Sequence, residues 1–574
     1  MRNRLLPLLL VVAAAAGCNG GADVQEQVEA TLQRTLAAQA RPPYVTTDAE
    51  GKKLWKLTQQ FYERRSHTPA WIKGTKPLPQ ISELIAALQT AGDDGLDPQL
   101  YSVGLLDQRR QEASKGFLTK KGFEPKEAGS LDVWLTYLYM KYASDLADGL
   151  SDLAHADPKW QIKPEKFDPA GRLESALSEN KVGASLAELM PDNPQYQALR
   201  KMLVEHRAQA AKGGWPAVPA QARLKPGQRS PLAAAIAGRL ASSGDFSGTA
   251  PAANSAVYTP ELQEAVKRFQ RRHGLTDDAL ITPAVIAEMN VPIDQRIRQI
   301  EMNLERWRWL PRDLGERHIL VNIPEYRLEV WDHGQVPVSM RVVVGKQDTQ
   351  TPIFSDEMTH VVFSPYWNVP PDIAQGETLP EIMKDPGFLA RANMEVLDQS
   401  GRPIDPSTID VGNPTSYRFR QRPGAQNSLG LVKFMFPNQF NVYLHDTPMD
   451  SLFARASRSF SHGCVRLENP LALAEYVLRD QQGWTREKIE QAMHAEEERT
   501  VKLKTAIPVY LGYWTARVSS DGVMQFRKDV YGIDSRLTAL LADRLSRLRK
   551  SAAAAAAASA MNRPATPLNR NSTD

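Results

Sequence analysis

The residues with the clearest chemical potential are a cysteine and a histidine late in the chain. Cys464 lies in the hexapeptide SHGCVR (461–466), and His445 precedes it by nineteen positions. A free thiol has a pKa of about 8.5, so only a few per cent is the nucleophilic thiolate at neutral pH. A neighbouring imidazole can take the proton from the sulfur. These residue types predict a thiol nucleophile with a histidine base.

The small number of cysteines supports a chemical role for Cys464. The 574-residue chain has two cysteines, and the other, Cys18, ends an apolar N-terminal segment. In an oxidising compartment, an unpaired cysteine is not expected unless its thiol has a function. Two alternatives remain, a buried structural cysteine and a zinc site. A zinc site needs more Cys or His ligands at suitable spacing, and Cys464, His445 and His462 make a poor ligand set.

The alternating pattern at 440–445 selects His445 as the base. On a strand, residues 441, 443 and 445 share one face, so His445 and Tyr443 would face a cysteine on an adjacent element. We expect His445 to act as base and later as acid, with its ring oriented by a backbone carbonyl and Tyr443 beside the substrate. His462 lies in the tight turn before the cysteine, and we expect its side chain to point away from the sulfur.

The other residues of the hexapeptide have distinct expected roles. Gly463 lets the backbone turn sharply and brings N–H groups near Gly463 and Cys464 to the reacting carbonyl. One such donor to an oxyanion is typically worth about 3 kcal/mol. Arg466 is placed to bind a carboxylate through two N–H groups.

The first 18 residues predict a lipoprotein-type signal peptide. Two arginines precede the apolar run 5–16, which is too short to span a bilayer of about 30 Å and fits the centre of a secretory signal. Cys18 would then be acylated and anchor the protein; ordinary secretion is the alternative. Because Asn19, not Asp, follows the cysteine, we expect the outer membrane more than the inner one. The expected location is the periplasm of a Gram-negative bacterium.

Composition and patterning predict a multidomain α+β protein. Hydrophobic residues make up 42% and charged residues 24%, as in globular proteins. The net charge of +4 gives no case for nucleic acid as a partner. The expected segments are a signal peptide (1–18), a tether (19–44), a helical scaffold (45–206), a linker with a three-helix module (207–295), a mainly-β catalytic domain (296–545) with a capping insertion (375–435), and a disordered alanine-rich tail (546–574).

Local signals support the expected helices and strands. A long helix is predicted over 131–150, with apolar residues four apart. In the module, Thr259-Pro260 and Thr282-Pro283 predict helix starts, and Gly274 predicts a helix end. From 317 onward, alternating apolar residues flank the hairpin signal at 332–334.

The module resembles a known wall-binding family. Residues 265–275, followed by Thr282-Pro283, resemble the peptidoglycan-binding domain 1 type. The Asp-Gly usual after its second helix is Asp278-Ala279 here. Wall binding and a purely structural spacer therefore both remain open for this copy.

The hexapeptide carries a second resemblance. His445, fifteen residues and then SHGCVR resemble the active-site motif of L,D-transpeptidases with a YkuD-type catalytic domain. Segments 302–308, 365–370, 424–438 and 458–470 resemble the large YcbB-like subfamily. The resemblance spans roughly 45 to 540 and implies the same layout of helical scaffold, wall-binding-like module and capped catalytic domain.

That resemblance implies a reaction. The Cys464 thiolate would attack the third residue of a tetrapeptide stem, expel D-alanine and pass the acyl group to a diaminopimelate amine on a neighbouring stem. Trp367, Tyr443, Ser461 and Arg466 map onto the substrate-binding region. No metal or organic cofactor is implied, carbapenems would acylate the cysteine, and a carboxypeptidase would supply the tetrapeptides.

Several alternatives share the first half of this reaction. Water as acceptor would make the protein an L,D-carboxypeptidase or a cross-link hydrolase, and a protein acceptor would attach an outer-membrane protein to the wall. A non-catalytic wall-binding scaffold would not need Cys464 and His445 together. The sequence leaves the acceptor and the oligomeric state open.

Overall fold

The computed structural model describes residues 19–107, 123–150, 160–162, 166–220, 224–248, 252, 256–385, 387–409 and 416–561. Cys18 and the predicted signal peptide lie outside this part of the chain. Two compact units are present. The helical unit comprises Met1–Ser151, Glu165–Pro191 and Ala539–Asp574, and the large unit comprises Asp152–Pro164 and Asp192–Thr538. Among the described residues, the helices are too short or too polar to cross a membrane.

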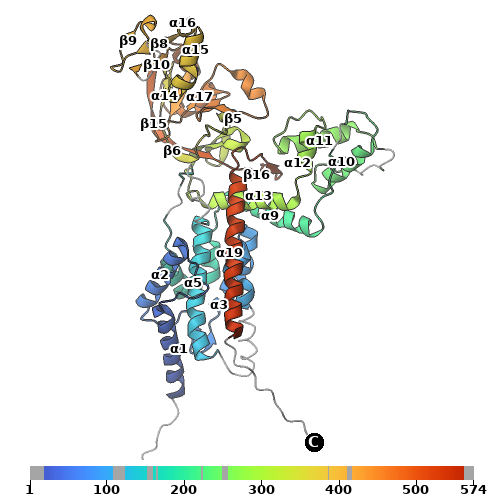
Figure 1. Ribbon diagram of the computed structural model, residues 1–574, viewed down its shortest axis with the longest axis vertical. Helices are drawn as coiled ribbons and strands as arrows, with labels where there is room; N and C mark the ends of the chain where they lie inside the picture. Colours follow the sequence, from blue (N-terminus) through green and yellow to red (C-terminus); the bar gives the residue numbers. More distant parts are fainter. Residues whose placement is uncertain are drawn as a thin grey trace, which may run out of the picture. The chain divides into compact units, whose positions relative to one another are not determined.

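The helical unit is built around one buried helix, α5, which covers most of the helix predicted over 131–150. In Figure 1, α1, α2 and α5 run beside one another. The elements of the helical unit are α1 (Asn19–Ala37), α2 (Ala49–Arg64), β1 (Ile72–Lys73), β2 (Lys76–Pro77), α3 (Gln80–Gln89), η1 (Ala91–Asp94), η2 (Pro98–Tyr101), α5 (Pro125–Asp148), α7 (Pro169–Glu179), α8 (Val182–Ala187) and most of α19 (Ile533–Met561). Asp132 of α5 accepts hydrogen bonds from the Tyr62 hydroxyl and the Trp71 amide.

The predicted tether (19–44) was wrong for residues 19–37. Residues 19–37 form α1, whose Val28 and Leu32 are fully buried. The helix approaches α5 closely at Gly129, where a β-carbon would lie 2.5 Å from the Val28 carbonyl oxygen. A glycine here lets the two backbones meet, so α1 belongs to the core of this unit.

The predicted disordered tail was wrong up to Met561. Helix α19 continues through the alanine run 552–558. Alanine has the highest intrinsic helix propensity, so a long alanine run extends a helix that packing has already nucleated. Leu541 and Leu545 supply that packing, since both are buried. Residues 562–574 lie outside the described part.

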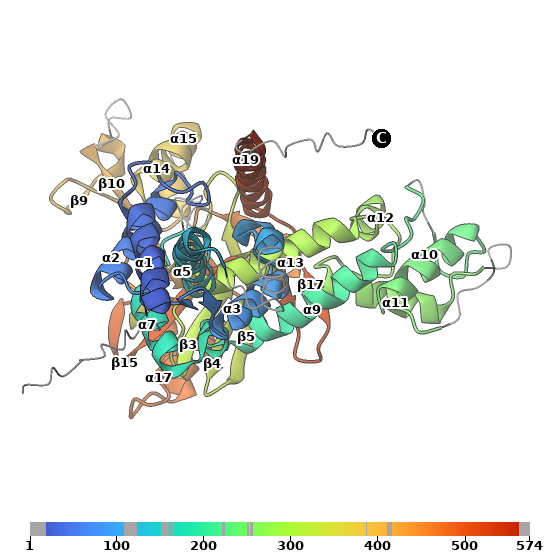
Figure 2. The same cartoon turned by 90° about the horizontal axis from the view of Figure 1, so that it is seen from below.

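The three-helix module has the predicted helices. They are α10 (Pro231–Ser242), α11 (Pro260–Arg272) and α12 (Pro283–Met289). Thr259 and Thr282 cap α11 and α12 by accepting backbone N–H groups, and Gly274 follows α11 with φ of +66°. Figure 2 shows these helices gathered together, beyond the paired helices α9 (Pro194–Ala211) and α13 (Ile293–Arg308). Helix α9 falls within the large compact unit, while the predicted scaffold segment 45–206 contains most of it.

The large unit contains a mixed sheet. Its strand order in the described residues is β13-β5-β14-β12-β11-β6-β15-β3-β4. The strands are β3 (Arg317–Asn322), β4 (Arg327–Asp332), β5 (Gln335–Gly345), β6 (Phe354–Phe363), β11 (Val432–Met435), β12 (Leu444–His445), β13 (Ser459–Ser461), β14 (Val465–Leu467) and β15 (Arg499–Gly512). The predicted hairpin joins β4 to β5 through His333 and Gly334, both with positive φ, as a tight hairpin turn requires.

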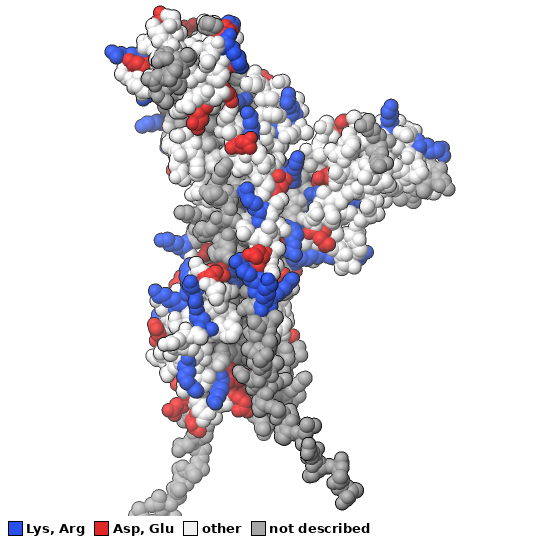
Figure 3. Space-filling model, in the orientation of Figure 1, with Lys and Arg blue, Asp and Glu red and all other residues white. Residues whose placement is uncertain are grey.

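Further elements surround this sheet. They are η3 (Ile323–Glu325), η7 (Asp450–Ala454), α17 (Pro470–Leu478), α18 (Arg486–Met493), β16 (Ala516–Val518) and β17 (Met524–Phe526). Helix α17 begins with Pro470, and the Asn469 side chain caps it by accepting the Ala472 N–H. On the face of this unit seen in Figure 3, basic and acidic side chains are interspersed rather than gathered into a surface of one sign.

The insertion is a small subdomain with its own sheet and core, and we call residues 367–421 the cap. Its elements are β7 (Trp367–Asn368), α14 (Pro371–Ile373), the π-helical segment η4 (Ala374–Thr378), α15 (Leu379–Lys384), α16 (Phe388–Arg391), β8 (Met394–Leu397), β9 (Pro403–Ile404), η5 (Pro406–Thr408) and β10 (Arg418–Gln421). Its strand order is β7-β10-β8-β9. The predicted bounds 375–435 were shifted, because β7 is already part of the cap and β11 pairs with β6 in the main sheet.

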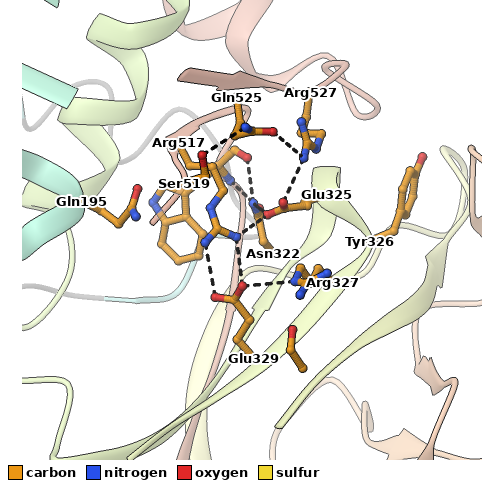
Figure 4. Close-up of polar contacts among 12 residues, drawn as sticks. Gln195, Asn322, Glu325, Tyr326, Arg327, Glu329, Arg517, Ser519, Gln525 and Arg527 are labelled. Atoms are coloured by element: carbon orange, nitrogen blue, oxygen red, sulfur yellow. Dashed lines mark hydrogen bonds and ion pairs between the residues drawn. The ribbon is translucent and has the colours of Figure 1, made fainter. Parts of the chain in front are cut away.

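A network of buried charges ties the β16–β17 hairpin to the first strands of the sheet (Figure 4). The Glu325 carboxylate accepts hydrogen bonds from Arg517 at 2.8 Å and from Arg527 at 3.0 Å. Arg517 also donates to Glu329 at 3.2 Å. These pairs join residues that are 188 to 202 positions apart in the sequence.

Candidate active site

Two short parallel strands bring the predicted nucleophile and base together. Strand β12 pairs with β14 so that Leu444 lies opposite Val465 and His445 opposite Arg466. Leu444 and Val465 are fully buried in the core. Side chains alternate between the faces of a strand, so Tyr443, His445, Cys464 and Arg466 all belong to the opposite face. The rings of Tyr443 and His445 are 5.7 Å apart.

The strand that carries His445 is shorter than predicted. The sequence predicted a strand over 440–445, whereas β12 covers Leu444–His445 alone. The Asn438 side chain accepts the N–H groups of Phe440 and Val442, which holds the preceding residues in a loop. Asn441 has φ of +55° in this loop, and its carbonyl oxygen accepts the Cys464 thiol at 3.8 Å.

The turn before Cys464 is held from within by Ser461. Its hydroxyl accepts the Gly463 N–H at 3.2 Å and donates to the Cys464 carbonyl at 2.6 Å. Ser461 is 2% exposed, so its hydroxyl is used inside the protein, and the geometry favours a positioning role over the expected substrate contact. Gly463 has φ of +124°, a conformation that favours glycine. The Thr351 hydroxyl donates to the Gly463 carbonyl at 2.8 Å.

This arrangement decides which amides remain free for an oxyanion. The Gly463 N–H is already bonded to Ser461, although the sequence analysis proposed amides near both Gly463 and Cys464. Within the described residues, the backbone N–H of Cys464 has no recorded acceptor. It is therefore the better candidate donor.

The His445 ring is oriented by a backbone carbonyl, as predicted. Its Nδ1–H donates to the Asp446 carbonyl at 2.5 Å, because a carbonyl oxygen can only accept. Asp446 is itself fixed, since its carboxylate accepts the Leu431 N–H at 2.8 Å. Gly430 lies against this carboxylate with φ of +60°, where any side chain would overlap it.

Burial sets the ionisation of both groups in opposite directions. Burial lowers the pKa of His445 to about 3, and the positive charge of Arg466 adds to this effect. Burial raises the pKa of the Cys464 thiol to about 11, although hydrogen bonds from Tyr443 and the charge of Arg466 oppose it. At neutral pH both groups are therefore uncharged. The thiol makes its hydrogen bond to Asn441, and within the described residues none joins it to His445.

The remaining predicted residues divide between the site and the cap. Arg466 is half-buried, contacts the Met449 sulfur at 3.8 Å, and its buried Nε has no acceptor among the described residues. The His462 ring points to the cap, where Nε2 lies 2.8 Å from Oε1 of Glu377. Trp367 packs against the cap core, and no described contact joins it to Cys464.

Sequence reasoning missed four residues that shape the site: Thr351, Glu377, Asn441 and Asp446. Of these four, only Asp446 could have been found from the sequence, because it directly follows the predicted base His445. Among the described residues, no group of three or more His, Cys, Asp or Glu side chains could hold a metal ion.

Family models match three parts of the chain. Residues 316–502, which contain both Cys464 and His445, match the YkuD family, described as an L,D-transpeptidase catalytic domain. The chain carries a YkuD-type L,D-transpeptidase catalytic domain. Residues 230–289 match a family described as "putative peptidoglycan binding domain", and residues 56–203 match a scaffold domain family. The three matches agree with the layout of a helical scaffold, a wall-binding-like module and a YkuD domain.

Individual proteins resemble parts of this chain. A Haemophilus influenzae protein named "Putative L,D-transpeptidase" is 33% identical over 243 residues, which are 42% of this chain and 49% of the relative. The matching region thus spans about half the length of that relative. Two solved structures are also similar: an L,D-transpeptidase from Stackebrandtia nassauensis (13% identity, 52% of this chain, 97% of that chain, TM-score 0.20) and one from Xylanimonas cellulosilytica (14% identity, 51% and 99%, TM-score 0.17).

The YkuD domain also contains the cap. Residues 367–421 fall inside the matched range, between the strands β6 and β11 of the main sheet. Every residue singled out for the site except Cys18 lies in this domain. The scaffold and the wall-binding-like module precede it in the chain.

Proposed function

We propose that this protein is a cysteine-dependent L,D-transpeptidase that cross-links peptidoglycan stems through a thioester on Cys464. The register of β12 and β14 carries this proposal, because it aligns Cys464, His445, Tyr443 and Arg466 on one face of a YkuD domain. An uncharged imidazole with its proton on Nδ1 carries its lone pair on Nε2. Such a ring can act as a general base.

The first half-reaction begins with rotation of the Cys464 sulfur away from the Asn441 carbonyl towards His445. The imidazole Nε2 takes the thiol proton as the sulfur attacks the carbonyl carbon of the third stem residue. The Cys464 N–H donates to the resulting oxyanion. The C–N bond to D-alanine then breaks, and His445 returns its proton to the leaving amine. The hydrogen bond to Asn441 at 3.8 Å is weak, which suits its loss at this step.

The second half-reaction transfers the acyl group. The side-chain amine of a diaminopimelate on a neighbouring stem attacks the thioester, and His445 removes the proton of the attacking nitrogen. The C–S bond breaks, the sulfur recovers a proton, and the product links two third-position residues. Arg466, with its unpaired Nε, would bind a carboxylate of the stem. The anchor at Cys18 and a carboxypeptidase that supplies tetrapeptides belong to the same proposal.

Tetrapeptide muropeptides test the reaction directly. Incubation with the full chain should give dimers that lack one D-alanine, detected by mass spectrometry. Cys464→Ala should abolish them, and His445→Ala should lower the rate by about 10²- to 10⁴-fold, the usual contribution of a general acid–base group. His333→Ala, at a histidine that is 71% exposed on a hairpin, should leave the rate unchanged.

The products separate the alternatives. Tripeptide monomers without dimers would show that water is the acceptor and that the protein is a carboxypeptidase. Loss of cross-links from an added dimer would indicate a hydrolase. Full activity of the Cys464→Ala protein would refute the thioester mechanism.

A further inference from the structure

The cap reaches the catalytic turn through one helix with an irregular centre. Residues 371–384 form α14, the π-helical segment η4 and α15 in succession. Pro380 explains the irregularity, because proline cannot donate a backbone hydrogen bond and its ring clashes with the carbonyl four residues earlier. Short π segments inside helices occur frequently at functional sites. Glu377 projects from this one.

Glu377 touches the turn that carries the nucleophile. Its Oε1 lies 2.8 Å from the His462 Nε2, two residues before Cys464. The partners are 85 positions apart in the sequence. Within the described residues, no other hydrogen bond or ion pair joins residues 369–420 of the cap to the face formed by β12 and β14.

The same carboxylate acts on Arg466. The negative charge of Glu377 raises the pKa of Arg466, which burial otherwise lowers, so the two groups lie within electrostatic reach. The buried Nε of Arg466 still has no acceptor in the described residues. The Glu377 carboxylate thus contacts His462 directly and lies near enough to Arg466 for its charge to act on that guanidinium.

We infer that Glu377 is an internal substitute for a substrate carboxylate, and that it holds the cap to the catalytic turn until the donor stem displaces it. This inference rests on the proposed function, because a tetrapeptide stem supplies the competing carboxylate. The contact is suited to exchange, since the side chains of Glu377 and His462 are 57% and 32% exposed. An exposed pair of this kind is held weakly enough for a ligand to replace it.

The free protein gives the first test, which does not depend on activity. Hydrogen exchange of the backbone amides at 371–384 should be faster in Glu377→Ala than in the unmodified chain. Glu381→Ala is the matched control, because Glu381 lies one turn later on the same helix and pairs with Lys384 at 2.7 Å. His462→Ala should match Glu377→Ala, and the double variant should exchange no faster. Equal exchange in the Glu377 and Glu381 variants would show that the Glu377–His462 contact does not hold the cap to the catalytic turn, and would overturn the inference.

Ligand binding gives the second test. In the Cys464→Ala full chain, which cannot turn over, calorimetry with a tetrapeptide muropeptide should show about 1.5- to 5-fold tighter binding for Glu377→Ala, the range expected when a weak exposed pair no longer competes. Weaker binding would mean that Glu377 holds the substrate amine, and unchanged binding would mean no competition; either overturns the inference. If the tetrapeptide does not bind and no dimers form, the proposed function fails instead. Hydrogen exchange still decides whether Glu377 holds the cap to the catalytic turn.

Discussion

At the scale of single residues, the resting site holds two neutral groups rather than an ion pair. Burial disfavours both the imidazolium of His445 and the thiolate of Cys464. Arg466 acts on both, because its charge lowers the pKa of the thiol and of the imidazole. In the proposed reaction, proton transfer from Cys464 to His445 would therefore be coupled to attack on a bound substrate.

This electrostatic state predicts the pH dependence of alkylation. Because the thiol pKa is held near 11, the iodoacetamide rate at Cys464 should rise about tenfold per pH unit from pH 7 to 9. Arg466→Ala removes a charge that favours the thiolate, so the rate at each pH should fall. Peptide mass spectrometry can follow Cys464 separately from Cys18.

Arg402→Ala is the control, at an arginine that is 81% exposed in the cap. It should react like the unmodified chain. A rate that is already constant below pH 7 would show a thiolate–imidazolium pair at rest and would contradict the neutral site.

At this scale the sequence pointed to the candidate residues of the site but to only part of the contacts that hold them. Cys464, His445 and Gly463 stand out because their spacing is local and their residue types are reactive. Thr351 contacts the turn from 112 positions away, and Glu377 from 85. Neither lies near the motif in the sequence, so only the folded chain shows their contacts with the turn.

At the scale of elements, predictions succeeded where the signal was local. Threonine caps and prolines in the first turn located α11 and α12, because their hydrogen bonds lie within three residues. The strand at 440–445 and the helix α1 were misjudged for non-local reasons. The first is shortened by the Asn438 side chain, and the second is ordered by packing on α5 at Gly129.

The charge network of Figure 4 makes a prediction for the β16–β17 hairpin. Burial alone would raise the pKa of Glu325, but the charges of Arg517 and Arg527 outweigh it and lower the pKa to about 2. An unfolded glutamate titrates near 4.3. The stabilisation is therefore present above pH 4.3 and is lost as the pH falls towards 2, by about 3 kcal/mol in total.

Calorimetry between pH 7 and 2.5 checks this dependence. Glu325→Gln should be less stable at pH 7 by about 3 kcal/mol, because Arg527 loses its carboxylate partner and Arg517 keeps only Glu329. The difference from the unmodified chain should shrink as the pH falls below 4.3. Glu316→Gln, at an 82% exposed site, should follow the unmodified chain. A difference that stays constant with pH would rule out the titration of Glu325 as its source.

At the scale of the whole molecule, the large unit joins the wall-binding-like module to the catalytic sheet through the same hairpin. Arg527 donates to the Arg272 carbonyl at the end of α11, and the Arg296 guanidinium lies 4.6 Å from the ring centre of Phe526. Gln299 of α13 donates to the Thr515 and Arg527 carbonyls at 2.9 Å. The module and the site therefore belong to one packed body, which would hold a wall contact at a fixed distance from Cys464.

Loosening this junction should separate activity on the wall from activity on soluble fragments. Phe526 is 1% exposed and packs against His273 at the end of α11 and Arg296 of α13, so Phe526→Leu should weaken the docking of the module while keeping an apolar side chain there. If the module holds the wall, cross-linking of insoluble sacculi should fall roughly tenfold, because the local concentration of stems is lost. Cross-linking of soluble muropeptides should change less than twofold, since a small diffusing substrate gains nothing from the junction. Val523→Ala, at the 41% exposed tip of the same hairpin, should affect neither substrate. An equal loss on both substrates would place the role of the hairpin in the catalytic site, and no loss on either would show that the module acts as a spacer.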